Sequence, residues 1–454
     1  MLEIEEECSK TCWIKPSKVS IVLWVTYVNT MLYALCFQLQ KPVEPFLVKQ
    51  LSVNAEDSES VARTYGLLQS FFSVIQTVGS PLVGILMDRV GIRKASAMVF
   101  LASALSYVIL AGASDMRLLF YSKIPTVLQH AFLVSQAAAT SSTLGDESAR
   151  AQALGRMTTA YTLGATIGPY LGGVLAQGGD LYIGAKFAVM GSLLSAVLSL
   201  LFLPNGSHRD DRITRKVILG NVNGGNQNDS GLRQFPTLFQ ELCRSVHLML
   251  RASLWPLLAV KVIGGVAASI YTTAFPLVLT QQLKFDPSSL GIAMSSSMLS
   301  VAAFGAIGMA PLARALGIPR MTRTGVVARA ILGWSLAASF SDSWVLDRST
   351  MLLLHRQIFL INMMQSVASH ALATGLTTQT TGSVEPDELG SLLGLEHALF
   401  SLARIAGPPI GSALLAFGAS GFWIVANVCG AIDIMLFALL TFSTSQVALA
   451  SKRK

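Results

Sequence analysis

Eleven residues, GILMDRVGIRK (84–94), pass abruptly from apolar side chains to a dense group of charges and glycines. Their chemistry would be electrostatic rather than covalent, because a carboxylate beside arginines or a facing helix N-terminus is stabilised by about 0.3–2 kcal/mol. Glycines in such a loop allow helices to approach closely and permit a tight turn. The residues of this charged loop are Gly84, Asp88, Arg89, Gly91, Arg93 and Lys94.

Ionisable side chains also occur at and within long apolar runs, where each costs at least about 2–3 kcal/mol inside lipid. A group that carries protons across a membrane must be a carboxylate or histidine that water reaches from each side in turn. The candidates are Glu44, His130, Glu396 and His397. No nucleotide loop, catalytic triad spacing or metal-ligand cluster accompanies them, so we expect no enzyme activity and no metal site.

Two arginines inside apolar runs need a counter-charge. Arg404 lies eight residues after Glu396, on the same helix face, and either that glutamate or a carboxylate-containing substrate could neutralise it. Arg329 and Asp433 both fall near the middle of apolar runs, and we expect them to neutralise each other if their helices touch.

The elements that must hold these side chains are membrane spans. Hydrophobic residues make up 52% of the 454-residue chain and charged residues only 13%. The mean hydropathy of +0.56 is far outside the soluble range. A net charge of +8 would suggest nucleic acid in a soluble protein, but here the basic residues cluster between apolar runs. We therefore expect a multi-pass membrane protein that contacts lipid and binds no nucleic acid.

Apolar runs of about 20 residues predict an all-α protein whose twelve transmembrane helices form two six-helix bundles. The first six spans are expected at 20–40, 65–87, 95–113, 118–140, 153–176 and 182–203. The other six are expected at 254–279, 289–310, 322–340, 350–376, 391–416 and 421–443. The chain then divides into an N-terminal segment (1–19), one half (20–203), a linker (204–253), a second half (254–443) and a basic tail (444–454).

Lysine and arginine are enriched in cytoplasmic loops of membrane proteins. Their distribution here places both termini and the linker in the cytosol. The linker is rich in glycine, asparagine and charge, and cannot bury enough apolar surface to form a core of its own. Both the plasma membrane and an internal membrane fit this pattern.

Two pairs of segments repeat each other, which indicates that the halves are copies. GRMTTAYTLGATIGPYLGG (155–173) lies over GLEHALFSLARIAGPPIGS (394–412) without a gap, and a looser match lays Gly66–Gly91 over Gly291–Gly317. Small residues four apart allow backbone contact between helices, and proline bends a helix. The expected packing or hinge residues are Gly164, Gly168, Pro169, Gly172, Gly407 and Pro408. Duplicated membrane bundles tend to bind solute between the halves.

The charged loop resembles the loop signature of the major facilitator superfamily, and GATIGPYLGG (164–173) resembles the fifth-helix signature of its drug and proton antiporters. WVTYV (24–28), ALGRM (153–157) and LAVKV (258–262) are similar to the organic cation transporter-like members of solute carrier family 22. The resemblance implies secondary active transport of small organic solutes by alternating access, in the form of proton-coupled antiport of organic cations or drugs. It also implies a monomer without a cofactor.

The resemblance further implies roles for individual residues. Asp88 would join a contact between the second and eleventh helices that holds the outward-open state; the alternative is that the loop only anchors the chain by its positive charge. Helices one, four, seven and ten would line the solute cavity, with the eleventh beside it. The expected solute-binding residues are Tyr33, Gln38, Lys123, Gln129, His130, Lys261, Tyr271, Gln365 and Arg404.

The chain departs from the antiporter pattern in two places. KIPTVLQH (123–130) lacks the Gln-Gly that usually follows the basic residue of the fourth helix, and no acid lies in the middle of the first span. Lys123 and Lys261 could instead extend their amines along the helix toward the membrane surface. The alternative function is a transport-inactive, transporter-like scaffold or sensor.

Overall fold

The computed structural model of the chain describes residues 16–52, 57–143, 147–204, 251, 254–341, 348–384, 389–417 and 421–452. In these ranges the regular structure is helical throughout, as predicted. The predicted N-terminal segment and linker lie almost wholly outside the described residues. The expected tail begins within a helix, because the last helix continues to Lys452.

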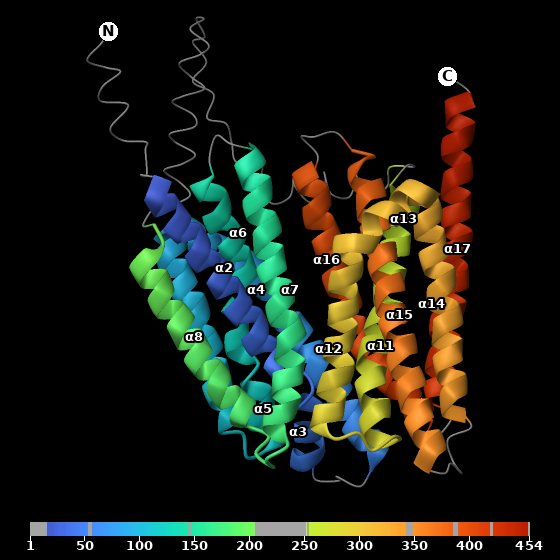
Figure 1. The fold of residues 1–454 in the computed structure, drawn as a ribbon, viewed down its shortest axis with the longest axis horizontal. Helices are drawn as coiled ribbons and strands as arrows, with labels where there is room; N and C mark the ends of the chain where they lie inside the picture. The colour runs from blue at the N-terminus through green and yellow to red at the C-terminus, as the bar shows by residue number, and fades with distance from the viewer. Residues whose placement is uncertain are drawn as a thin grey trace, which may run out of the picture.

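The first half begins with α2, and its helices occupy one side of Figure 1, coloured blue to green. Its elements are α2 (Pro16–Leu39), α3 (Glu44–Leu51), α4 (Ser58–Ala111), α5 (Met116–Tyr121), η1 (Ile124–Leu128), α6 (Ala131–Ser142), α7 (Glu147–Ala176) and α8 (Ile183–Phe202).

The second half, coloured yellow to red, stands beside it (Figure 1). Its elements are α11 (Trp255–Gln281), α12 (Pro287–Ala303), the π-helical η2 (Phe304–Gly308), α13 (Met309–Leu316), α14 (Ile318–Ser341), α15 (Arg348–Thr381), α16 (Leu389–Leu415) and α17 (Gly421–Lys452).

The helices follow the predicted spans in order, with two differences. The span expected at 118–140 is not one helix but the three short elements α5, η1 and α6. The span expected at 289–310 is interrupted by the π-helical turn η2. Among the described residues, seven helical stretches are long and apolar enough to cross a membrane.

Two glycines turn the chain at equivalent places in the halves. α4 covers two predicted spans, and the chain turns between them at Gly91 (φ 82°, ψ 162°). Gly317 (φ 74°, ψ 152°) makes the same turn between α13 and α14. A positive φ is unfavourable for residues that carry a Cβ atom, so both turns require glycine. The repeat therefore keeps the turn, although Arg314 replaces Asp88 beside it.

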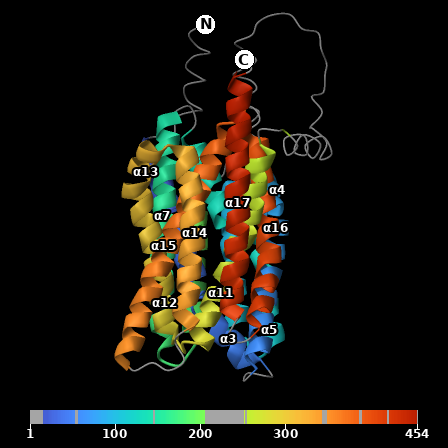
Figure 2. The same ribbon diagram turned by 90° about the vertical axis from the view of Figure 1, so that its right-hand side faces the viewer.

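The bundle has two distinguishable ends. α2 begins and α17 ends at the same end, which we call the terminal side (Figure 1). α3 and α5 lie at the opposite end, which we call the far side (Figure 2). These names are used below without reference to a compartment.

The halves contact each other toward the far side through two equivalent pairs of helices. α4 meets α16 at Gly66, where an added Cβ atom would lie 2.7 Å from the carbonyl oxygen of Pro408. α7 meets α12 at Gly291, where an added Cβ atom would lie 2.3 Å from the carbonyl oxygen of Pro169. The sequence repeats pair Gly66 with Gly291 and Pro169 with Pro408. One contact between glycine and a carbonyl is thus made twice, once from each half.

Hydrogen bonds accompany these contacts. The Ser70 hydroxyl of α4 donates to the carbonyl of Ile405 in α16 at 2.8 Å. The Gln177 amide donates to the Asp286 carboxylate, which caps α12, at 3.5 Å. Burial raises the pKa of Asp286, but hydrogen bonds from Ser289 outweigh burial and hold this pKa below its usual value. The carboxylate therefore stays charged at neutral pH.

The glycines of the repeated motif also pack each half internally. α7 lies backbone to backbone on α2, because an added Cβ at Gly172 would lie 2.1 Å from the carbonyl oxygen of Leu39. α16 lies on α11 in the same way, with 2.8 Å from Gly411 to the carbonyl oxygen of Ile270. Gly164, Gly168 and Gly407 are similarly crowded by α2 or α11. Close packing explains these residues, and a hinge role stays a prediction.

A buried ion pair joins α14 to α17. Arg329 and Asp433 are only 5% and 2% exposed. The guanidinium donates two hydrogen bonds to the carboxylate, at 2.7 and 3.3 Å. The mutual neutralisation expected from the sequence is present in the structure.

Replacing Arg329 by methionine should destabilise the protein by about 3–5 kcal/mol, because Asp433 would be left buried and unpaired. The exchange of Arg329→Asp with Asp433→Arg should recover most of this loss. The melting temperature of the detergent-solubilised protein measures both effects. Arg320→Met changes an exposed arginine of the same helix and serves as the control. Equal melting of Arg329→Met and this control would show that the pair carries no stability.

Candidate functional site

A break in the fourth predicted span creates the main polar site. Pro125 lies at the start of η1 and has no N–H to donate, so the helix cannot continue regularly from α5 into η1. Non-helical backbone at membrane depth is tolerated where other groups take up its hydrogen bonds, and it commonly lines a binding site. Lys123 stands in this break, between α5 and η1.

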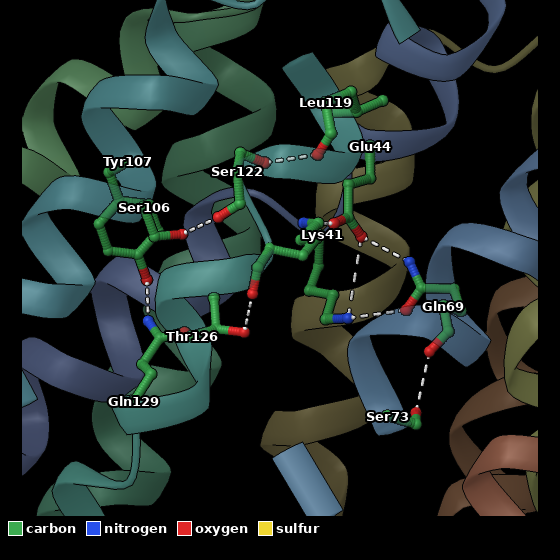
Figure 3. Close-up of polar contacts among 11 residues, drawn as sticks. Lys41, Glu44, Gln69, Ser73, Ser106, Tyr107, Leu119, Ser122, Thr126 and Gln129 are labelled. Atoms are coloured by element: carbon green, nitrogen blue, oxygen red, sulfur yellow. Dashed lines mark hydrogen bonds and ion pairs between the residues drawn. The ribbon is translucent and has the colours of Figure 1, made fainter. Parts of the chain in front are cut away.

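Side chains from neighbouring helices satisfy the carbonyl groups that the break releases. The Ser106 hydroxyl donates to the carbonyl of Ser122 at 2.7 Å, and the Gln76 amide donates to that of Thr126 at 2.6 Å. The Tyr33 hydroxyl donates to the carbonyl of Gln129 at 3.3 Å. α2 and α4 therefore hold the broken segment in place. Gln129 in turn donates to the hydroxyl of Tyr107 at 2.9 Å (Figure 3).

A second break places a carboxylate opposite Lys123. α2 ends before Pro42, and Pro45 lies in the first turn of α3, so the chain bends sharply between the two helices. Glu44 begins α3 and is buried, with a side chain only 4% exposed. Its carboxylate pairs with the ammonium group of Lys123. A carboxylate and a lysine that are 79 positions apart in the sequence thus form one buried ion pair.

Two further groups complete this charged cluster, which we define as Lys41, Glu44, Gln69 and Lys123 (Figure 3). The Gln69 amide donates to the Glu44 carboxylate at 2.8 Å and accepts from the Lys41 ammonium at 3.3 Å. The Lys41 ammonium lies 3.8 Å from the same carboxylate. Two lysines face one glutamate, so the charged cluster carries a net charge of +1.

Aromatic rings stabilise the surplus charge. The Lys41 ammonium lies 5.1 Å from the ring centre of Phe37 and 5.7 Å from that of Phe72, and Lys123 lies 5.8 Å from the latter. Cations at this distance are attracted by the ring faces. The cavity beside the cluster has a volume of about 20 Å³, room for one water molecule. Gln40 lines it, is 5% exposed, and neither atom of its amide has a hydrogen-bond partner among the described residues.

A row of aromatic side chains leads from the terminal-side half of the bundle to the charged cluster. Phe132 of α6 lies 5.4 Å from Tyr161 of α7, and Tyr161 lies 6.5 Å from Tyr33 of α2, measured between ring centres. The row continues from Tyr33 to Phe37 at 6.3 Å and on to Phe72 at 5.8 Å. We call these five residues the aromatic row.

Arg404 of the second half lies near the aromatic row. It is exposed, although it lies in the middle of α16. Tyr33 and Tyr161 of the first half are among its neighbours. Glu396 does not neutralise it, because that carboxylate pairs with Lys261 at 2.5 Å and accepts from Thr380 at 2.6 Å. The expectation that Glu396 could be the partner of Arg404 is therefore wrong.

An open cavity of about 450 Å³ lies between α2 and α7, toward the terminal side. It is lined by Trp24, Tyr27, Val28, Met31, Arg156, Thr159, Ala160 and Leu163. All of these lining residues belong to the first half, whereas the contacts between the halves described above lie toward the far side.

The structure brings only some of the predicted solute-binding residues together. Tyr33, Lys123 and Gln129 join Glu44 around the broken segment. Gln38 packs on Gly168, and His130 packs on α4 at Gly79. In the second half, Tyr271 donates to Asn362 at 3.1 Å within a buried network. Gln365 is buried and its side-chain oxygen has no hydrogen-bond partner among the described residues.

The charged loop lies at the terminal side, away from this site. Arg93 donates to the carbonyl of Leu203 at the end of α8, which ties the loop to its own half. Arg89 and Lys94 are exposed. An added Cβ atom at Gly84 would meet no atom within 4 Å. The side chains of Asp88 and His397 are outside the described structure, so their expected roles stay predictions.

Sequence reasoning missed Lys41 and Gln69. The signal for Lys41 was the spacing in QKPVEP (40–45), where lysine and glutamate are three apart between two prolines. Gln69 lies inside an apolar run and gave no signal of its own. Among the described residues, no group of three or more histidine, cysteine, aspartate or glutamate side chains is arranged to hold a metal ion.

Comparisons with known proteins agree with the fold. The family model described as Major Facilitator Superfamily matches residues 26–277 and 257–453. Mouse "Solute carrier family 22 member 18" is 25% identical over 398 residues, covering 87% of this chain and 89% of that protein. The class G tetracycline resistance protein of Vibrio anguillarum is 25% identical over 394 residues, covering 84% and 87%. The crystal structure of the nucleoside transporter NupG superposes with a TM-score of 0.67 at 12% identity, covering 94% and 99%.

Glu44→Gln should destabilise the protein more than Lys123→Met. The first change leaves two lysines without a carboxylate, at a cost of about 3–5 kcal/mol, whereas the second leaves Glu44 paired with Lys41. The double variant keeps the net charge of +1 and should melt above Glu44→Gln alone. Melting temperatures of the purified variants test this order. A lower melting temperature for Lys123→Met than for Glu44→Gln would contradict the proposed charge balance.

Proposed function

Because this chain belongs to the major facilitator superfamily, we propose that it is a secondary active transporter that moves small organic solutes across a membrane by alternating access. The protein is a multi-pass membrane protein with the fold of that superfamily. The observation that carries the proposal is the duplicated contact of Gly66 with Pro408 and of Gly291 with Pro169. It joins the halves near the far side, while Arg404 of the second half lies near Tyr33 of the first.

The proposed motion is a rocking of one half against the other. Opening the far side separates both glycine contacts together, because they are equivalent by the internal repeat. Closing the terminal side brings the charged loop toward the second half. In this proposal Asp88 then contacts α16 and stabilises the state that is open on the far side. A Cβ atom added at Gly84 would meet nothing within 4 Å, which leaves room for the second half to approach the charged loop. The terminal side is proposed to face the cytosol.

Proton coupling is proposed to run through Glu44. It is the carboxylate of the charged cluster, and it lies where the breaks after α2 and after α5 meet. A proton on Glu44 would release Lys41 and Lys123, so protonation and the binding of a charged solute become linked. Glu396 is the second candidate, because it also pairs with a lysine, Lys261, in the other half.

The proposed form of transport is antiport of drugs or organic cations. Drugs as solutes are in keeping with the names of relatives, which include tetracycline resistance proteins and "Multidrug resistance protein 2" of Bacillus subtilis. The net charge of +1 at the cluster favours a neutral or anionic solute at that place. Uptake into proteoliposomes, screened across organic cations, organic anions and sugars, tests transport itself. Absence of flux for every class would favour the scaffold or sensor.

Alanine at both Gly66 and Gly291 should weaken closure on the far side and shift the protein toward the state closed on the terminal side. Each added methyl would collide with a carbonyl oxygen of the other half, and overpacking of this kind costs about 1–3 kcal/mol. That energy corresponds to a change of about 5- to 150-fold in the equilibrium between two states. The rate at which a membrane-impermeant thiol reagent modifies Thr159→Cys measures this equilibrium between the two states, because Thr159 lines the open cavity.

The matched control is alanine at Gly155 and Gly333, one glycine from each half, where an added Cβ atom meets nothing within 4 Å. This variant should be modified at the rate of the otherwise unchanged protein. If the Gly66 and Gly291 variant were modified as fast as the control, the far-side contacts would not govern alternating access.

Removal of the titratable carboxylate should uncouple flux from the proton gradient. The variant for this test is Glu44→Gln with Lys123→Met, which keeps the net charge of the cluster. Solute flux through the unchanged protein should follow an imposed pH gradient, and flux through the variant should not. The gradient dependence of uptake into proteoliposomes gives the answer. If flux through the unchanged protein did not depend on the pH gradient, proton coupling would be contradicted. If flux through the variant still depended on the gradient, Glu44 would not be the proton carrier.

A further inference from the structure

The charged cluster leaves one cation incompletely neutralised. Glu44 is satisfied by Lys123 and by the Gln69 amide, and its side chain is 4% exposed. Lys41 is its more distant partner, at 3.8 Å, and the Lys41 side chain is 22% exposed. Among the members of the ion pairs, Lys41 is thus the one that solvent or a solute can reach. Its other neighbours are the side-chain oxygen of Gln69, at 3.3 Å, and the faces of Phe37 and Phe72.

A second cation faces the same space from the other half. Ser70, next to Gln69, donates to the carbonyl of Ile405, so the turn of α16 that carries Arg404 touches the turn of α4 beside the cluster. Arg404 and Lys41 interact electrostatically across this contact. Tyr33 and Tyr161 lie near Arg404, and no carboxylate among the described residues forms an ion pair with it.

Two like charges that face one space repel each other unless an anion lies between them. Arginine is well suited to a planar carboxylate, because its guanidinium can donate two parallel hydrogen bonds. The aromatic row runs between the two cations, with Tyr33 and Phe37 on α2, and offers ring faces to an apolar body. These groups therefore match a molecule with an acidic head and an aromatic or apolar body.

We propose that the transported solute is an organic anion, whose acidic group binds between Lys41 of the first half and Arg404 of the second while its apolar body lies on the aromatic row. This inference rests on the proposed transport function and adds the substrate class. The Glu44–Lys123 pair stays formed when the anion binds. The amide of Gln40, which has no hydrogen-bond partner in the described part of the chain, provides a hydrogen-bonding group at the edge of the site. The anion turns a repulsion between the halves into an attraction.

The test compares salicylate with its uncharged amide, salicylamide. Binding of each to the purified full-length protein is measured by isothermal titration at neutral pH. Salicylate should bind at least about tenfold more tightly than salicylamide, because hydrogen bonds to charged groups contribute more than neutral ones. Lys41→Gln and Arg404→Gln should each weaken salicylate binding by about 10- to 100-fold and leave salicylamide binding almost unchanged. Lys41→Arg should retain most of the affinity.

Lys49→Gln and Arg320→Gln are the matched controls, since both remove an exposed cation outside the site. Lys41→Gln leaves Glu44 paired with Lys123, so it should melt near the unchanged protein, and a loss of binding would not reflect unfolding. Equal affinity for salicylate and salicylamide would overturn the proposal. So would salicylate binding that survives both Lys41→Gln and Arg404→Gln, or competition by chloride at the same concentration as salicylate.

Uptake separates this inference from the transport proposal. Proteoliposomes are tested with radiolabelled salicylate and with tetraethylammonium as a cationic probe. Salicylate uptake that is lower in Lys41→Gln and in Arg404→Gln than in the unchanged protein supports both the transport function and the anion site. Uptake of tetraethylammonium alone would overturn the anion inference and leave transport intact. Charge-dependent salicylate binding with no uptake of either probe would overturn transport and leave an anion-binding site in a scaffold or sensor.

Discussion

The rest of this structure depends on the close approach of helix backbones at glycine. α7 and α16 each lie against a helix of their own half on one face and a helix of the opposite half on another, and both contacts leave no space for a Cβ atom. The helices that build each half are therefore also the ones that join the halves. Because the contacts are equivalent by an internal repeat, a change at one place in the sequence motif alters both the packing within a half and the joint between halves.

The repeat preserved this packing but not the chemistry. In the first half, prolines break the chain after α2 and after α5, and the released backbone surrounds a buried carboxylate and two lysines. In the second half, α15 runs as one helix over the corresponding span, and its neighbours are held by the Tyr271–Asn362 network. The first half thus contains the charged cluster, whereas the second half is more regular and contributes Arg404. This division explains why a single charged cluster can serve a molecule with two similar halves.

Composition and the repeats were enough to predict the helical class and the order of the helices, because hydrophobic length and glycine spacing act locally along the chain. The superfamily was predicted from the resemblance of GILMDRVGIRK and GATIGPYLGG to its signatures. The pairing of Arg329 with Asp433 followed from the cost of burying either charge alone. The break at Lys123 was missed, since KIPTVLQH is apolar enough to be counted as one span and a single proline does not always interrupt a helix. Arg404, in the same helix as Glu396, was expected as a partner of that carboxylate. In the structure, Glu396 pairs with Lys261 of α11. Contacts between distant segments, such as Lys123 with Glu44, have no signature in either segment alone.

The far-side joint has one more consequence. Its two glycine contacts are made by neutral backbone, whereas the terminal side carries exposed basic residues such as Arg89, Lys94, Arg156 and Arg320. Mobile ions screen interactions between exposed charges but do not alter the contact of a glycine with a carbonyl group. The two openings of the molecule therefore differ in their sensitivity to ionic strength: salt acts on the approach of the terminal ends and leaves the far-side joint unaffected.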